Sequence, residues 1–160
     1  MSSTFRHSIC EPLHPTVLEK GAIAKEQILP LLAAFPWRKY LLEMQQAEEQ
    51  EIHFSPSLEV ENKDKRQGIV ISAVGEPDDF EFYIFYKRPK EGNPAFVSDL
   101  TEQTLEDAKT CIEALIEGDA AYLEEFFAEP TPITYSSPIT PTPESNPKPS
   151  FWTRLKQLFS

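Results

Sequence analysis

Three potential metal ligands, His7, Cys10 and His14, form the closest group of imidazole and thiol side chains in the sequence. Imidazole and thiolate groups at such spacing can hold Zn²⁺ or Cu²⁺. No fourth ligand stands nearby, and Pro12 would interrupt a helix that could align the three. We therefore expect neither a metal site nor a cofactor here, and we interpret residues 1–15 as an extended, loosely held arm.

Other catalytic signatures are weak. The five glycines are too far apart to cradle a phosphate or to form a nucleophile elbow. The carboxylates within residues 76–79 lack the register of a calcium-binding loop. Glu124 and Glu125 are better explained as the outer face of a helix than as a general acid and base. The sequence therefore predicts a protein that is not an enzyme.

A second group of candidate residues is aromatic and lies in residues 78–89, the densest apolar run of the chain. Strand periodicity places Tyr83 and Phe85 on one face, and it places a fully apolar set on the other, namely Phe80, Phe82, Ile84 and Tyr86. The apolar set is expected to form core under helices. Tyr83 and Phe85 either form a binding patch or are covered by a loop at residues 92–100.

The third candidate is the basic amphipathic peptide at residues 151–160. Helical spacing puts its large apolar side chains on one side and its basic ones on the other, and the residues predicted to bind are Trp152, Leu155, Phe159, Arg154 and Lys156. Ten residues alone are marginal as a helix in water, so we expect the helix to form on binding. Three binding sites remain open: a groove of a partner protein, an anionic membrane surface, or the acidic domain of the same chain.

Composition divides the chain into three parts. Residues 1–128 have the composition of one globular domain. Residues 129–150 contain seven of the fifteen prolines and almost no charge, which predicts a flexible linker rich in Pro, Thr and Ser. Residues 151–160 form the amphipathic C-terminal peptide.

The charge is concentrated in the domain. The whole chain carries a formal charge of −11, and residues 1–128 hold 24 acidic and 12 basic side chains. An acidic surface repels the phosphate backbone of a nucleic acid, so we do not expect this protein to bind nucleic acid. The functional expectation is a partner protein with a basic surface, and the alternative is that net negative charge only keeps a small domain soluble.

Location is inferred from what the sequence lacks. The two cysteines form no CxxC pair, the first residues contain no apolar signal region, and no run approaches eighteen apolar residues. These features favour a cytoplasmic protein. Attachment to the membrane periphery through residues 151–160 is the alternative.

The predicted elements define an α+β fold. Turn signals between short β-branched and aromatic runs favour an antiparallel meander of about four strands. The expected strands are residues 51–54, 58–61, 69–74 and 80–86. Apolar stripes at helical spacing predict helices before and after the sheet, at 22–35, 36–46, 104–118 and 119–128. The helices are expected on one face of the meander, followed by a disordered C-terminal tail.

These features together favour a non-enzymatic protein-binding or adaptor protein. A specific version is an inhibitor or immunity-type protein that neutralises a basic target. One alternative is a membrane-surface accessory protein anchored by residues 151–160. The other is a small enzyme or ligand-binding domain whose site forms only in three dimensions, with His53, Glu81 and Tyr83 as its candidate residues.

Overall fold

The computed structural model of the protein describes residues 4–128. The predicted linker and the C-terminal peptide, with Trp152, Arg154, Leu155, Lys156 and Phe159, lie outside the described residues.

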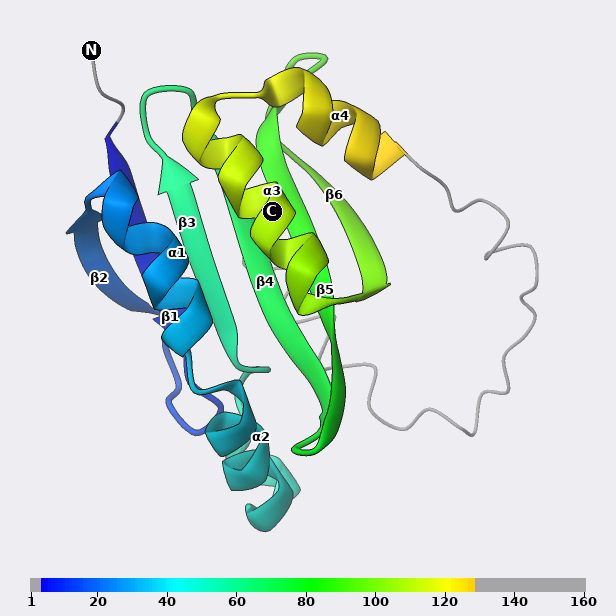
Figure 1. Ribbon diagram of the computed structural model, residues 1–160. Helices are drawn as coiled ribbons and strands as arrows, with labels where there is room; N and C mark the ends of the chain where they lie inside the picture. Colours follow the sequence, from blue (N-terminus) through cyan, green and yellow to red (C-terminus); the bar gives the residue numbers. More distant parts are fainter. Residues whose placement is uncertain (1–3, 129–160) are drawn as a thin grey trace.

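The described chain begins with a strand pair, passes through two helices and a short 3-10 helix, continues through four strands, and ends with two helices (Figure 1). The strands are β1 (Phe5–Cys10), β2 (Leu18–Ile23), β3 (Ser57–Asn62), β4 (Gln67–Glu76), β5 (Asp79–Lys90) and β6 (Asn93–Gln103). The helices are α1 (Lys25–Ala34), α2 (Trp37–Gln46), η1 (Glu49–Glu51), α3 (Leu105–Glu117) and α4 (Ala120–Ala128).

All six strands of the described residues join one antiparallel sheet in the order β2-β1-β3-β4-β5-β6. The α+β class and the antiparallel sheet are confirmed. The expected number of about four strands is wrong, because β1, β2 and β6 were not predicted and residues 51–54 do not form a strand. The meander covers only β3 to β6, since β1 is inserted between β2 and β3.

The N-terminal segment is the largest correction. Residues 1–15 were expected to be loosely held, but β1 pairs with strands on both sides. Just before it, the Thr4 amide donates to the Asp64 carboxylate at 2.7 Å, and the Thr4 carbonyl accepts from the Lys63 amide at 2.9 Å. A strand bonded along both edges cannot be a free arm.

The helices α1, α3 and α4 lie on one face of the sheet, and α2 lies near one end of it (Figure 1). Strand β5 faces this layer with the apolar set predicted from its periodicity: Ile84 and Tyr86 are fully buried, Phe82 is buried, and Phe80 packs against the same core. The prediction that this face forms core under helices is confirmed.

Local sequence signals determine the ends of the last two helices. Thr104 and Asp107 form a capping box at the start of α3, with hydrogen bonds of 3.1 and 2.9 Å, as expected from their spacing. Gly118 ends α3 in the left-handed conformation that glycine adopts without strain. Asp119 then caps α4 by accepting from the Tyr122 amide at 3.0 Å.

The two earlier helices agree only in part with their predicted bounds. The segment 36–46 forms helix α2, as its spacing indicated, with Trp37, Tyr40 and Leu41 buried. Pro30 was expected to kink or divide the first helix, yet α1 includes it within one continuous element. The predicted start at residue 22 is wrong, because β2 continues to Ile23.

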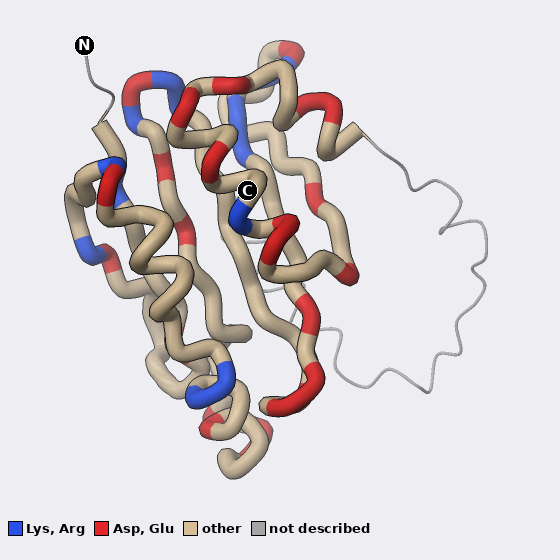
Figure 2. The backbone as a smooth tube through the Cα atoms, in the orientation of Figure 1, with Lys and Arg blue, Asp and Glu red and all other residues tan. Residues whose placement is uncertain are grey.

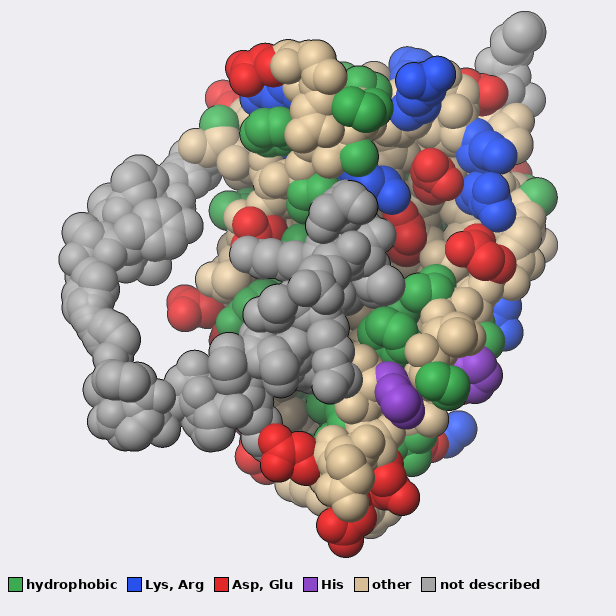
Figure 3. Space-filling model, turned by 180° about the vertical axis from the view of Figure 1, so that it is seen from behind, with side chains coloured by type: hydrophobic (Ala, Val, Ile, Leu, Met, Phe, Trp, Pro, Cys, Tyr) green, Lys and Arg blue, Asp and Glu red, His purple; other side chains and the backbone are tan. Residues whose placement is uncertain are grey.

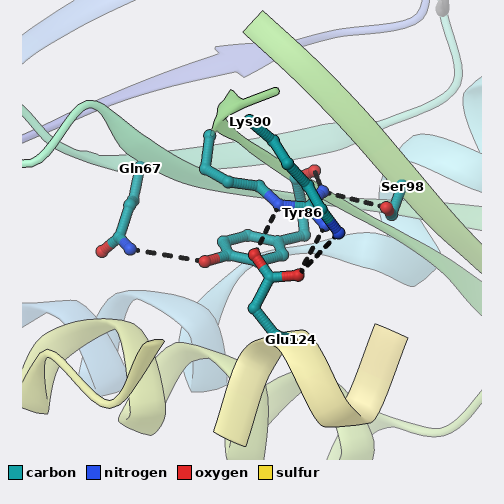
Figure 4. Close-up of polar contacts among 6 residues, drawn as sticks. Gln67, Tyr86, Lys90, Ser98 and Glu124 are labelled. Carbon is teal, nitrogen blue, oxygen red and sulfur yellow. Dashed lines mark hydrogen bonds and ion pairs between the residues drawn. The ribbon is translucent and has the colours of Figure 1, made fainter. Parts of the chain in front are cut away.

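Helix α4 is fastened to the sheet through the carboxylate of Glu124 (Figure 4), which binds a buried arginine of β5. Arg88 donates two hydrogen bonds of 2.9 Å to the Glu124 carboxylate and one of 2.9 Å to the Ser98 hydroxyl. Its guanidinium lies 4.4 Å from the ring centre of Tyr86, whose hydroxyl accepts from Gln67 at 3.3 Å. The Arg88 hydrogen bonds lower the pKa of Glu124 and keep it charged.

None of the helices in the described part of the chain combines the length and apolar character needed to cross a membrane.

Candidate functional site

The face of the sheet opposite α1, α3 and α4, called the rear face below, carries the candidate site. The register of the strands places alternate residues there, because successive side chains of a strand point to opposite faces. No α-helix within residues 4–128 lies on this face (Figure 1). Two of the residues predicted to bind, Tyr83 and Phe85, point to it from β5.

A small apolar cluster lies at the middle of the rear face and is separated by the sheet from the main core. We call it the rear cluster, and it consists of Val70, Tyr83, Phe85 and Val97. Val70 of β4 stands directly across from Phe85 of β5. Val70 and Phe85 are 2% and 1% exposed, whereas Tyr83 and Val97 are half-buried. The structure thus brings Tyr83 and Phe85 together with two valines.

The alternative that a loop at residues 92–100 covers Tyr83 and Phe85 needs correction. These residues belong to β6, which lies beside β5 in the same sheet and does not cross over it. Val97 contributes to the rear cluster, but Phe96 points to the helix side, where its ring centre lies 4.8 Å from the Arg88 guanidinium.

Carboxylates surround the rear cluster. Glu59 stands across from Val70, and Asp99 stands across from Phe85. The pKa of Tyr83 is raised, first by burial and then by the negative charges of Glu81, Glu102 and Asp99. The centre of this face is therefore apolar and aromatic, and its margin is predominantly acidic. Acidic residues also outnumber basic ones over the fold as a whole (Figure 2).

Basic side chains are present on the rear face near β1 and β2. Lys87 lies 3.3 Å from the Glu59 carboxylate, and Arg6 lies 3.2 Å from that of Glu19. Together with Glu61 they line an open hollow of about 250 Å³. Acidic and basic side chains alternate on this side of the molecule in the view from behind (Figure 3).

A row of small side chains crosses the rear face and ends at Tyr83 of the rear cluster. Cys10, Ser57 and Ser72 face one another in successive strands, and Tyr83 stands across from Ser72. The Ser57 and Ser72 hydroxyls are 2.7 Å apart and bonded. Burial, with a smaller contribution from Glu59, raises the pKa of the Cys10 thiol to about 12. A thiol held neutral in this way is a poor nucleophile.

The potential ligands at the N-terminus do not converge. His7 and Cys10 are three residues apart in β1 and therefore point to opposite faces, and His14 lies beyond the end of the strand. Within residues 4–128 no group of three or more His, Cys, Asp or Glu side chains is placed to hold a metal ion. His53, a candidate of the enzyme alternative, lies in the loop before β3.

Sequence reasoning did not find Val70, Val97, Glu59 or Asp99 as members of the site. The signal for Val70 was present, because the alternation in residues 69–74 places it on the same side as Ser72. The partnership of Glu59 and Asp99 with the cluster depends on the register between strands, which pairs residues far apart in sequence.

Comparison with known proteins finds no match to this chain: no family model, no curated protein and no solved structure is significantly similar to it.

Proposed function

We propose that this protein is a non-enzymatic protein-binding protein that recognises a basic surface of its partner through the rear face. The observation that carries the proposal is the rear cluster, an apolar and aromatic centre with carboxylates at its margin. Protein interfaces commonly combine a central aromatic or aliphatic anchor with a polar rim. The half-buried Tyr83 and Val97 serve as the anchor, with the buried Phe85 beside them, and Glu81 and Asp99 attract the basic residues of the partner.

The overall charge supports a basic partner. Residues 1–128 carry twice as many acidic as basic side chains. Complementary charge accelerates encounter and disfavours acidic competitors, although it adds less to the final affinity. An inhibitor or immunity-type protein that neutralises a basic target is the specific form of this proposal.

The C-terminal peptide provides a second contact in the proposed complex. Trp152, Leu155 and Phe159 enter an apolar groove of the partner, and Arg154 and Lys156 remain at its rim. A linker that joins two contacts makes the second one intramolecular, so two weak contacts give a tighter complex than either alone.

Affinity capture from the native host tests the proposal. The full chain is compared with a rear-face variant, Tyr83→Glu with Val97→Glu, and with Leu105→Glu, which adds a charge at an exposed position of α3. We expect the full chain and Leu105→Glu to retain the same basic protein, and the rear-face variant to lose it. Retention that is equal for all three chains, or no retained protein, contradicts the proposal.

A further inference from the structure

We propose that residues 151–160 bind the rear face of their own chain in the free protein, and that a partner must displace them. The internal contact is argued from the domain and the peptide alone. Only the competition with a partner rests on the proposed function.

The burial of the rear cluster is the first observation. Val70 and Phe85 are 2% and 1% exposed. Side chains on one face of a sheet are fully buried when a second layer packs against that face. On the other face α1, α3 and α4 form that layer, but no α-helix within residues 4–128 lies over the rear cluster (Figure 1). The described helices therefore do not account for the burial of this cluster.

The apolar side chains of residues 151–160 match the apolar centre of the rear face. At helical spacing they share one side of the peptide, and the set is Phe151, Trp152, Leu155, Leu158 and Phe159. The rear face offers these side chains the rings of Tyr83 and Phe85 together with the two valines of the rear cluster.

The charges of the rear face and of the C-terminal peptide are complementary. Glu81 and Asp99 flank the rear cluster, and both act on the Tyr83 hydroxyl. The C-terminal peptide carries Arg154 and Lys156 and no acidic side chain. The peptide is basic and apolar, and the rear face has an acidic margin and an apolar centre. The two surfaces therefore match in charge and in apolar character.

The connection is long enough. Residues 129–150 are 22 residues, and a proline-rich chain extends about 3.1 Å per residue, so the upper reach is about 70 Å. A domain of this size is roughly 35 Å across. The tether also gives an effective concentration on the order of 1 mM, which favours the same chain over a second copy in dilute solution.

Competition follows from this tether. If the peptide alone binds the rear face with a dissociation constant of about 0.1 mM, an effective concentration of about 1 mM keeps roughly nine chains in ten closed. The partner then binds the rear face about tenfold more weakly than it binds a chain with a disabled peptide. Displacement frees Trp152, Leu155 and Phe159 for the second contact of the complex.

Fluorine NMR of the full chain, with 5-fluorotryptophan at both tryptophans, tests the internal contact without a partner. Trp37 is 6% exposed in the core on the helix side and reports folding, whereas Trp152 reports the peptide. Trp152→Phe assigns the two signals. We expect the Trp152 signal to differ in shift and width from that of a synthetic peptide of residues 148–160, at all protein concentrations.

Rear-face variants locate the contact. Tyr83→Glu with Val97→Glu is expected to move the Trp152 signal to the position of the synthetic peptide, while the Trp37 signal stays in place. Leu105→Glu, on the helix side, is expected to move neither signal.

A Trp152 signal identical to that of the synthetic peptide in the unmodified chain overturns the proposal. So does a signal that departs from it only at high protein concentration or only with anionic vesicles, since these outcomes assign the peptide to a second copy or to a membrane. Absence of the internal contact in the unmodified chain would overturn this proposal without changing which protein the capture experiment is expected to retain, so the two proposals fail separately.

Discussion

The two faces of the sheet differ in what covers them. Ile84 and Phe85 are neighbours in β5 and are almost equally buried, at 0% and 1% exposed. Ile84 belongs to a large core built with four helices, whereas Phe85 belongs to a cluster of four hydrophobic residues. Under the proposed function, burial alone does not distinguish a permanent core from an interaction surface. The distinction lies in whether the covering layer is part of the domain.

This difference has a consequence for energetics. On the helix side, removing a side chain leaves a cavity between two layers that belong to the domain. On the rear face the covering layer is proposed to come from a tethered peptide, which can adjust or dissociate. Substitutions on the two faces are therefore expected to differ in cost even when the exposed fractions are the same.

The largest expected effect is on the helix side. Ile84→Ala should lower the free energy of unfolding by about 2–5 kcal/mol, because a fully buried side chain is replaced by a cavity. Urea unfolding followed by circular dichroism measures it. Tyr83→Ala, the half-buried neighbour on the rear face, is the matched control and should cost less. An equal or larger loss for Tyr83→Ala would remove the contrast between the faces.

A matched pair of valines sharpens the comparison. Val60 on the helix side is 0% exposed, and Val70 on the rear face is 2% exposed. Val60→Thr buries a hydroxyl among apolar groups and should cost about 1–3 kcal/mol. Val70→Thr should cost less than about 1 kcal/mol, since the carboxylate of Glu59 across the strand offers an acceptor. Thermal unfolding of the two variants measures the difference, and equal costs would show that both faces are equally closed.

The ion pair under α4 gives a smaller effect that depends on pH. Glu124→Ala should cost about 1 kcal/mol, because the side chain is 40% exposed but leaves the buried Arg88 without its bidentate partner. The pKa of Glu124 is lowered in the folded protein, first by the hydrogen bond from Arg88. The stabilisation is therefore present above the ordinary value of 4.5 and is lost as the pH falls through the lower folded value.

Unfolding measured from pH 7 down to pH 2 tests the direction in which this stabilisation changes with pH. The difference in stability between the protein and Glu124→Ala should shrink as the pH falls. Glu19→Ala is the control, since the Arg6–Glu19 pair is far more exposed and should contribute only a few tenths of a kcal/mol. A difference that grows toward low pH contradicts the assignment.

The smallest expected effect concerns the two thiols, one on each side of the sheet. Burial raises the pKa of both Cys10 and Cys111 to about 12. Both should react slowly with iodoacetamide at pH 8, and Cys10 should react first, because the layer proposed to cover the rear face is separable. Peptide mass spectrometry after timed reaction measures the order. Modification of Cys111 first would contradict it.

Raised thiol pKa values also set the direction of the stability change with alkali. The unfolded thiols ionise near pH 9 and the folded ones near pH 12, so stability falls as the pH rises between these values. Cys111→Ala should reduce that dependence.

The sequence predicts the C-terminal half of the domain better than the N-terminal half. The Thr104–Asp107 capping box, Gly118 and the aromatic alternation of β5 are local signals, and local physics determines those elements. Strand β6 carries no comparable run: it begins with Asn93 and Pro94, alternates weakly, and obtains its order from pairing with β5.

Strand β1 shows why the rest could not be predicted. Phe5 and Ile9 alternate with polar residues, but the segment is short and is followed by Pro12. Its place in the sheet comes from bonding to β3, about fifty residues away. The rear cluster depends on the same kind of information, since Val70 and Val97 join Tyr83 and Phe85 only through strand register.

The insertion of β1 between β2 and β3 has a consequence for folding during synthesis. The β1–β2 pair can form early, since its strands are close in sequence, but one edge of β1 stays unpaired until Asn62 at the end of β3 has been made. Closing that gap costs more chain entropy than any hairpin later in the sheet. An unpaired edge is also open to strands of other nascent chains. The pairing of β1 with β3 is therefore the step that closes this edge within the chain and prevents its pairing with another chain.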